Sequence, residues 1–258
     1  MLLTSFLLIQ KNHITNPVKK FTDLSIKIFA DGANIYEMTT LYKNPMIKGF
    51  TTNPSLMRKA GIEDYRVFAL EVLEAIPDRP VSFEVFADNL TDMLAQAKVI
   101  ASWGSNVNVK IPVTNTKGEF TGPIVKELSS SGVQLNITAV FTREQVKIIA
   151  ENLSYDTPAI VSVFAGRIAD TGLDPIPIMS DCVEILKNYP KAELLWASPR
   201  ELLNIFQADE VGCHIITATP DVIGKLKLLE KDLTEFSLET VLMFFDDAQE
   251  AGYTINIT

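Results

Sequence analysis

The sequence of 258 residues has few of the residues on which several classes of protein depend. It contains two cysteines and two histidines, and they show neither a zinc-ligand spacing nor a disulfide framework. No basic run is longer than two residues and the net charge is −9, which argues against a nucleic acid partner. A Walker loop and a dinucleotide fingerprint are also missing. We therefore expect no metal and no cofactor.

Membrane and secretion signals are missing as well. No apolar run reaches the roughly 18 residues of a membrane span. The apolar start, Met1–Ile9, lacks the basic segment and the small-residue cleavage site of a signal peptide, and reads as a start-site extension or a docking segment. We expect a cytoplasmic protein without a membrane partner, in which Cys182 and Cys213 are reduced thiols.

Short β-rich runs alternate with helical patterns along the chain. The strand candidates are Ile26–Ala30, Lys48–Thr52, Val81–Ala87, Asn106–Ile111, Val133–Thr138, Ala159–Phe164, Glu193–Ala197 and Cys213–Thr217. Strands separated by helices pair in parallel, and eight such units favour an α/β fold of the (β/α)8 TIM barrel type. We expect a single domain, with residues 1–25 as an N-terminal extension, 26–230 as the barrel and 231–258 as a C-terminal helical tail.

The segments between the strands carry helix signals. Apolar residues at helical spacing predict one buried face for Leu90, Met93, Leu94, Ala97 and Ile100. Asn53 and Pro54 fit a helix cap and the first helical position, with Gly61 at the far end. Thr142 and Gln145 have the spacing of a capping box.

A last amphipathic pattern, Phe236–Ala251, follows the eighth unit. Its apolar side predicts packing on its own barrel or on a neighbouring subunit, so that both a monomer and a homo-oligomer fit the pattern.

Polar residues recur at alternate positions of the strands. In Val81–Ala87 the apolar positions alternate with Ser82, Glu84 and Phe86. Successive side chains of a strand point to opposite faces, and the apolar set faces the helices. The same alternation in the next strands, and the position of Asp31 after Phe29, predict a set of inward-pointing residues: Asp31, Glu84, Lys110, Asn136 and Thr138.

A lysine and two carboxylates inside a small barrel require an explanation, because an unpaired buried charge costs several kcal/mol. An interior salt bridge that only fixes the packing is one explanation. The other is carbonyl chemistry at the C-terminal strand ends, where active sites of this fold lie. Burial disfavours the ammonium form of Lys110 and exposes an amine that condenses with a ketone. Asp31 can exchange a proton with a substrate hydroxyl, and Glu84 can pass protons through water.

Further polar residues fall at the same strand ends. Asn53, Asn136 and Ser198 suit hydrogen bonds to sugar hydroxyls, and Arg167 and Arg200 suit a phosphate. Asn53 could instead only cap its helix, and each arginine could be an ordinary surface residue. Their joint position at successive strand ends favours a sugar-phosphate site.

The chain resembles the transaldolase family from about Ile28 to Thr219. The stretches that carry the resemblance are FADGAN, TTNPS, FEVFA, VKIPVT, NITAVF, SVFAGRI and ASPR. TTNPS followed by VKIPVT at this spacing is a specific signature, whereas ASPR alone is a weak one. The family fold is a (β/α) barrel.

The resemblance implies a role for each matching residue. Lys110 matches the Schiff-base lysine, Asp31 the acid/base at the hydroxyl next to the cleaved bond, and Glu84 and Thr138 the holders of a catalytic water. The implied contacts to sugar-phosphate substrates are Asn53, Asn136, Ser162, Arg167, Ser198 and Arg200. The implied reaction keeps a dihydroxyacetone unit on Lys110 as an enamine and passes it to an aldose phosphate, a step of the pentose phosphate pathway.

Some positions bear on the alternatives to this reaction. Family members that release free dihydroxyacetone, the fructose 6-phosphate aldolases, tend to carry Gln at Glu84 and Tyr at Phe164, so this chain follows the transferase pattern. Pro199 stands where an aromatic is common, and Gly32 where a hydroxyl-bearing residue is usual. A fructose 6-phosphate-type aldolase and a dedicated biosynthetic sugar transaldolase are therefore alternatives. A non-catalytic sugar-phosphate-binding barrel is the alternative from a different class.

Overall fold

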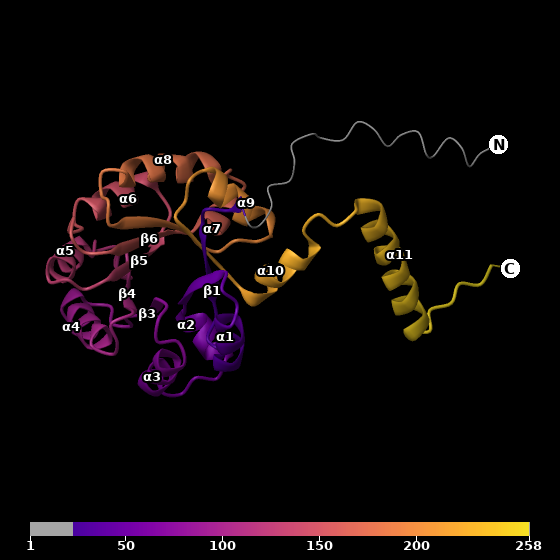
Figure 1. Cartoon of the computed structure of the whole chain (residues 1–258), viewed down its shortest axis with the longest axis horizontal. Coiled ribbons are helices and arrows are strands. Elements are labelled where there is room, and N and C mark those ends of the chain that lie inside the picture. Colours follow the sequence, from indigo (N-terminus) through magenta and orange to yellow (C-terminus); the bar gives the residue numbers. More distant parts are fainter. Residues whose placement is uncertain (1–22, 258) are drawn as a thin grey trace. The chain divides into compact units, whose positions relative to one another are not determined.

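The computed structural model describes residues 23–257 and separates them into two units, residues 23–224 and 225–257. The first unit is a closed barrel of parallel strands arranged in sequence order (Figure 1). The strands are β1 (Lys27–Asp31), β2 (Ile47–Thr51), β3 (Val81–Glu84), β4 (Val107–Pro112), β5 (Leu135–Val140), β6 (Ala159–Val163), β7 (Ala192–Trp196) and β8 (Ile215–Ala218). Pairing of β1 with β8 closes the sheet. The predicted (β/α)8 barrel is confirmed.

Helices connect the strands and surround the barrel (Figure 1). They are α1 (Ile35–Tyr42), α2 (Pro54–Lys59), α3 (Tyr65–Ala75), α4 (Leu90–Ala101), α5 (Gly122–Ser130), α6 (Arg143–Ala150), α7 (Ala165–Ala169), α8 (Ile176–Leu186), α9 (Leu203–Glu210) and α10 (Pro220–Gly224). Asn53 caps α2, with Pro54 at the start of the helix. The capping box of Thr142 and Gln145 is formed at α6. Gly61 follows α2 with φ +71°, a conformation that glycine adopts without strain.

The strand ends differ from the predicted ones by up to three residues, and the difference is largest at β3. This strand ends at Glu84, after which Gln96 accepts hydrogen bonds from the backbone N–H groups of Phe86 and Ala87. Phe86 is 51% exposed. The expectation that Phe86 points inward beside Glu84 is therefore wrong, because the chain has left the sheet before Phe86.

Both cysteines are buried free thiols of the barrel unit. Burial raises the pKa of Cys182 and of Cys213 to about 12, so both thiols stay protonated and unreactive near neutral pH. Within the part of the chain that the structure describes, no helix combines the length and the apolar character that a membrane crossing requires.

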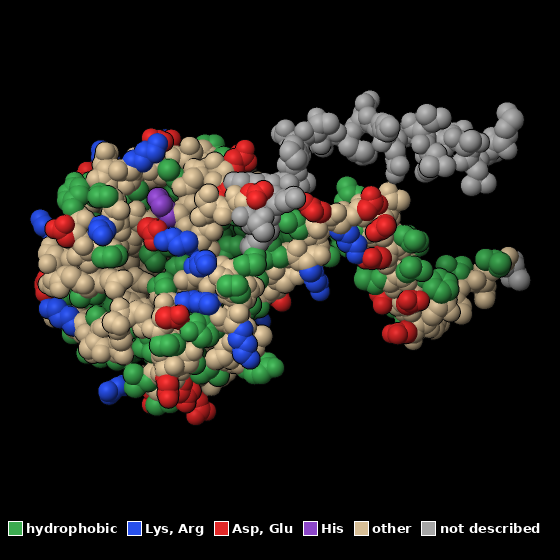
Figure 2. All heavy atoms as spheres, viewed as in Figure 1, with side chains coloured by type: hydrophobic (Ala, Val, Ile, Leu, Met, Phe, Trp, Pro, Cys, Tyr) green, Lys and Arg blue, Asp and Glu red, His purple; other side chains and the backbone are tan. Residues whose placement is uncertain are grey.

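The second unit contains a 3-10 helix (Lys225–Leu228) and α11 (Leu233–Glu250), and Asp232 caps α11. The predicted helix Phe236–Ala251 is confirmed apart from its last residue. Apolar and acidic side chains share its surface (Figure 2), and the exposed apolar ones include Leu238, Val241, Leu242, Met243, Phe244 and Phe245. Most of the predicted extension 1–25, with Met1–Ile9 and His13, lies outside the described residues.

Candidate active site

A cavity of about 450 Å³ lies among residues at and just beyond the carboxyl ends of the strands. Of the ten site residues predicted from the sequence, nine line it: Asp31, Asn53, Glu84, Lys110, Asn136, Thr138, Ser162, Arg167 and Ser198. The fold thus brings together side chains from β1 through the segment after β7. Arg200 is the predicted residue that does not line this cavity.

Lys110 is buried on β4, with its side chain only 8% exposed. Its Nζ donates a hydrogen bond of 2.6 Å to the carbonyl oxygen of Thr52 and lies 3.1 Å from Oε2 of Glu84. Glu84 and Lys110 are register partners on β3 and β4, so the two side chains project from adjacent strands. The amine is therefore held by two oxygens at the wall of a cavity large enough for a small substrate.

Asp31 is the last residue of β1 and faces the same cavity. Thr51 Oγ1 donates to one carboxylate oxygen at 2.8 Å, and Asn53 Nδ2 lies 3.5 Å from the other. Burial raises the pKa of Asp31, and the nearby Lys110 charge and these two hydrogen bonds oppose that rise. A carboxyl group whose pKa is moved toward neutrality is suited to taking up and returning a proton.

Asn53 caps a helix and also lines the cavity. Its Oδ1 accepts a hydrogen bond of 3.0 Å from the backbone N–H of Leu56, which caps α2. Its Nδ2 faces Asp31 in the cavity. The cap fixes the side chain, so the amide is presented to the cavity in one orientation.

Asn136 belongs to a buried chain of hydrogen bonds across three strands. Ser162 Oγ donates to Asn136 Oδ1 at 2.6 Å, and Asn136 Nδ2 donates to Ser82 Oγ at 3.0 Å. A similar contact joins Thr51 and Thr217, whose hydroxyl oxygens are 2.5 Å apart. The predicted site residues do not include Ser82, Thr51 or Thr217, although Ser82 has the inward parity of Glu84.

The two predicted phosphate-binding arginines have different surroundings. Arg167 lies on α7 at the cavity, with its guanidinium carbon 5.3 Å from the centre of the Phe164 ring. Arg200 makes a double hydrogen bond to Asp170, which lowers the pKa of Asp170 and raises that of Arg200. The structure thus places one arginine at the cavity and the other in a surface ion pair.

The backbone around the cavity is unusual at two positions. Ala139 and Ser198 have φ values of +58° and +62°, although neither is glycine. Both line the cavity, and Ala139 lies where the pairing of β5 with β6 shifts register. The carbonyl oxygen of Ser198 approaches Gly166 so closely that a Cβ there would lie 1.5 Å from it. Strained backbone of this kind is typical of binding and catalytic sites.

The fold and the cavity together define a class of protein. A (β/α)8 barrel with a buried lysine and two carboxylates around a cavity at its strand ends has the layout of enzymes that form Schiff bases with carbonyl substrates. Among the described residues, no group of three or more histidine, cysteine or acidic side chains is arranged to hold a metal ion.

Comparison with known proteins identifies the family. Residues 28–256 match the model of the transaldolase/fructose-6-phosphate aldolase family. The chain belongs to this family, and it is an enzyme with transaldolase-family function.

Relatives from three organisms agree with this assignment. The chain is 34% identical over 226 residues to a probable transaldolase of Dehalococcoides mccartyi. The alignment covers 87% of this chain and 100% of the relative. It is 33% identical over 236 residues to a probable transaldolase of Nitrosopumilus maritimus, covering 90% of this chain and 100% of the relative. A probable transaldolase of Herpetosiphon aurantiacus is 32% identical over 228 residues, with 88% and 98% covered.

Proposed function

We propose that this enzyme, a transferase, moves a dihydroxyacetone unit from a ketose phosphate to an aldose phosphate through a Schiff base on Lys110. The observation that carries the proposal is the position of the Lys110 amine, at the cavity and 3.1 Å from Glu84. The buried carboxyl group of Asp31 supplies the second proton carrier that the reaction needs.

In the proposed reaction, Nζ of Lys110 attacks the donor ketone, and the resulting carbinolamine loses water to form the Schiff base. Glu84 passes the required protons through a water molecule that it holds together with Thr138. The Asp31 carboxylate then takes the proton of the hydroxyl next to the bond that breaks. The departing aldose phosphate leaves an enamine on Lys110, and Asp31 returns its proton when the enamine adds to the acceptor aldehyde. Water then hydrolyses the new Schiff base, with Glu84 again passing the protons, so that the product ketose phosphate leaves and the Lys110 amine is restored.

Hydroxyl groups of the sugar have several polar partners around the cavity. We assign them to Asn53, Asn136 and Ser162, whose side chains are fixed by the hydrogen bonds described above. The phosphate is assigned to Arg167 and Ser198. Arg200 can join them only by giving up its double hydrogen bond to Asp170.

Arg167→Ala should weaken the use of phosphorylated donors, because it removes the arginine that lines the cavity. A hydrogen bond to a charged group contributes about 1.5–3 kcal/mol, so kcat/KM should fall roughly 10- to 150-fold, mainly through KM. Steady-state kinetics with fructose 6-phosphate and with unphosphorylated fructose measure this effect. If the variant loses as much activity toward fructose as toward its phosphate, Arg167 does not bind the phosphate.

Two cavity residues favour transfer over release of free dihydroxyacetone. Glu84 takes the position where releasing members of the family tend to carry Gln, and Phe164 the position where they tend to carry Tyr. Phe164 packs on Phe141 with 5.7 Å between ring centres and offers no hydroxyl group that could protonate the enamine. The enamine should therefore wait for an acceptor aldehyde.

With fructose 6-phosphate alone, the enzyme should release dihydroxyacetone at least about 100-fold more slowly than it transfers it to an acceptor, the factor expected when a general acid is missing. Enzymatic measurement of free dihydroxyacetone, with and without a panel of aldose phosphates, gives both rates. Comparable rates would identify a fructose 6-phosphate-type aldolase. Mass detection on the same panel separates a general transaldolase from a dedicated biosynthetic one.

We also propose a homo-oligomeric, cytoplasmic enzyme that acts in the pentose phosphate pathway. The exposed apolar side chains of α11 support assembly, because patches of this kind commonly form interfaces. Sedimentation of the full chain at micromolar concentration tests the assembly, and a monomer would contradict it. The two buried, protonated thiols are compatible with a reducing compartment, and cell fractionation tests the location.

A further inference from the structure

The backbone of Glu84 lies at a gap in the barrel sheet. Strands β2 and β3 pair at only two positions, Phe50 with Val81 and Thr51 with Ser82. The last backbone hydrogen bond between these segments runs from the N–H of Thr52 to the carbonyl of Ser82, and the chain then turns into α2. In parallel sheets, alternate residues direct their backbone groups to the same neighbour. Glu84 is thus the next residue of β3 to face β2, at a point where β2 has already ended.

A tyrosine hydroxyl takes the place of the missing strand. Tyr65, the first residue of α3, accepts a hydrogen bond of 2.7 Å from the Glu84 N–H and donates one of 3.0 Å to the Glu84 carbonyl. On the other side of β3, the Val85 N–H donates to the carbonyl of Lys110. The segment that carries the Glu84 side chain is therefore fixed from both edges.

The Tyr65 ring is itself fixed by aromatic neighbours. Its centre lies 6.1 Å from that of Phe83, 4.6 Å from that of Phe86 and 5.4 Å from that of Trp103. Burial raises the pKa of Tyr65 well above its usual value, so the hydroxyl stays protonated and able to donate at any working pH. Tyr65 does not line the 450 Å³ cavity, and therefore has no direct access to a substrate there.

From these contacts we propose that Tyr65 is a positioning residue that holds the Glu84 carboxylate in place beside the Lys110 amine. The inference rests on the proposed function, in which Glu84 moves protons during formation and hydrolysis of the Schiff base. The distance of 3.1 Å between Glu84 Oε2 and Lys110 Nζ depends on where β3 ends. Without the Tyr65 hydroxyl, the Glu84 N–H and carbonyl have no partner on the β2 side, and the end of the strand becomes free to move.

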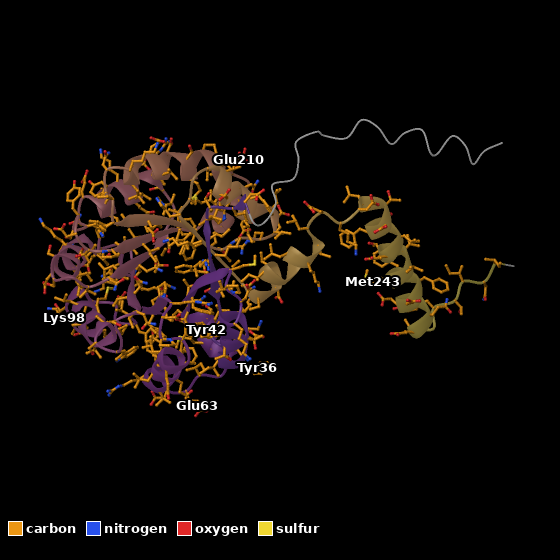
Figure 3. All side chains as sticks on the ribbon, viewed as in Figure 1. Tyr36, Tyr42, Glu63, Lys98, Glu210 and Met243 are labelled. Atoms are coloured by element: carbon orange, nitrogen blue, oxygen red, sulfur yellow. The ribbon has the colours of Figure 1, made fainter. Side chains whose placement is uncertain are left out.

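Tyr65→Phe removes the hydroxyl and keeps the ring, which makes it the direct test. Loss of the exact position of a proton carrier should lower kcat about tenfold while KM for fructose 6-phosphate changes by less than about twofold. The matched control is Tyr42→Phe at the end of α1 (Figure 3), which removes a hydroxyl bonded to Asp78 at 2.7 Å. This control should keep kcat within about twofold of the parent, as a surface change does.

If Tyr65 only stabilised the fold, Tyr65→Phe would lower the melting temperature but would not lower kcat at a nearly constant KM. In an active parent enzyme, a kcat of Tyr65→Phe within about twofold of the parent would overturn the inference, as would a rise in KM that matches the fall in kcat.

A second measurement keeps the inference separate from the proposed function. If the parent transfers no three-carbon unit and gives no Lys110 adduct, the proposed function fails, and hydrogen exchange at the Glu84 amide then tests Tyr65 alone. Exchange at this amide should be about fivefold to tenfold faster in Tyr65→Phe than in Tyr42→Phe, because one hydrogen bond is lost. Equal exchange rates in the two variants would overturn the role of Tyr65.

Discussion

Lys110→Met should abolish transfer of the dihydroxyacetone unit, with kcat reduced by at least about 10⁴-fold. Methionine fills a similar volume in the buried position on β4 but offers no amine to attack the ketone. Steady-state assays with fructose 6-phosphate and an aldose phosphate acceptor measure the loss, and circular dichroism shows whether the barrel is retained.

The matched control for this variant is Lys98→Met on α4, labelled in Figure 3, which removes a surface lysine paired with Glu127. It should keep kcat within about twofold of the parent, because exposed ion pairs contribute little to stability. A Lys110→Met enzyme with the activity of the control would exclude the Schiff-base mechanism. It would leave the alternative of an interior salt bridge with Glu84 that only fixes the packing.

Asp31→Asn should block cleavage while leaving the Schiff base able to form. Without the carboxylate, nothing takes the proton of the hydroxyl next to the breaking bond, and kcat should fall by about 10²- to 10⁴-fold. Borohydride treatment with fructose 6-phosphate should then trap the uncleaved donor on the protein, and mass spectrometry distinguishes it from a three-carbon adduct. A three-carbon adduct that forms at the parent rate would show that another group removes the proton.

The same substitution should change the dependence of stability on pH. Burial raises the pKa of Asp31 above its unfolded value, so ionisation of this carboxyl group destabilises the native state at neutral pH. That penalty disappears as the pH falls through the folded pKa toward the ordinary value of 3.8. Asp31→Asn should thus melt at a higher temperature than the parent near neutrality, with a difference that narrows in acid. A parent that melts at a higher temperature than Asp31→Asn near neutral pH would contradict this account.

The sequence predicts the inner face of the barrel well because strand geometry is local. Alternation along β3 and β4 is enough to place Glu84 and Lys110 inside, and the structure brings both to one cavity. The end of β3 could not be predicted in the same way, because the strand ends at Glu84, two residues after its pairing with β2 stops at Ser82, and that pairing joins segments about 30 residues apart. For this reason the alternation wrongly predicts that Phe86 points inward.

Two further features depend on contacts that no local pattern contains. Arg200 falls at the expected strand end, yet its side chain pairs with Asp170, which lies 30 residues earlier in the chain. Tyr65 has the pattern of an ordinary first residue of a helix, and its hydroxyl gains a role only because the gap at Glu84 faces it. The Arg200 ion pair depends on the reach of its side chain, and the Tyr65 contact depends on where β2 stops pairing with β3. Side-chain reach and strand pairing are both properties of the folded barrel.

The most direct test of the Schiff-base assignment is to locate the adduct on the parent protein. The full chain is incubated with fructose 6-phosphate, reduced with borohydride, digested and mapped by mass spectrometry. We predict a three-carbon adduct on the peptide that contains Lys110, and none on the peptides that contain the other lysines. Absence of an adduct, or an adduct on a different lysine, would contradict the central claim that Lys110 forms the Schiff base.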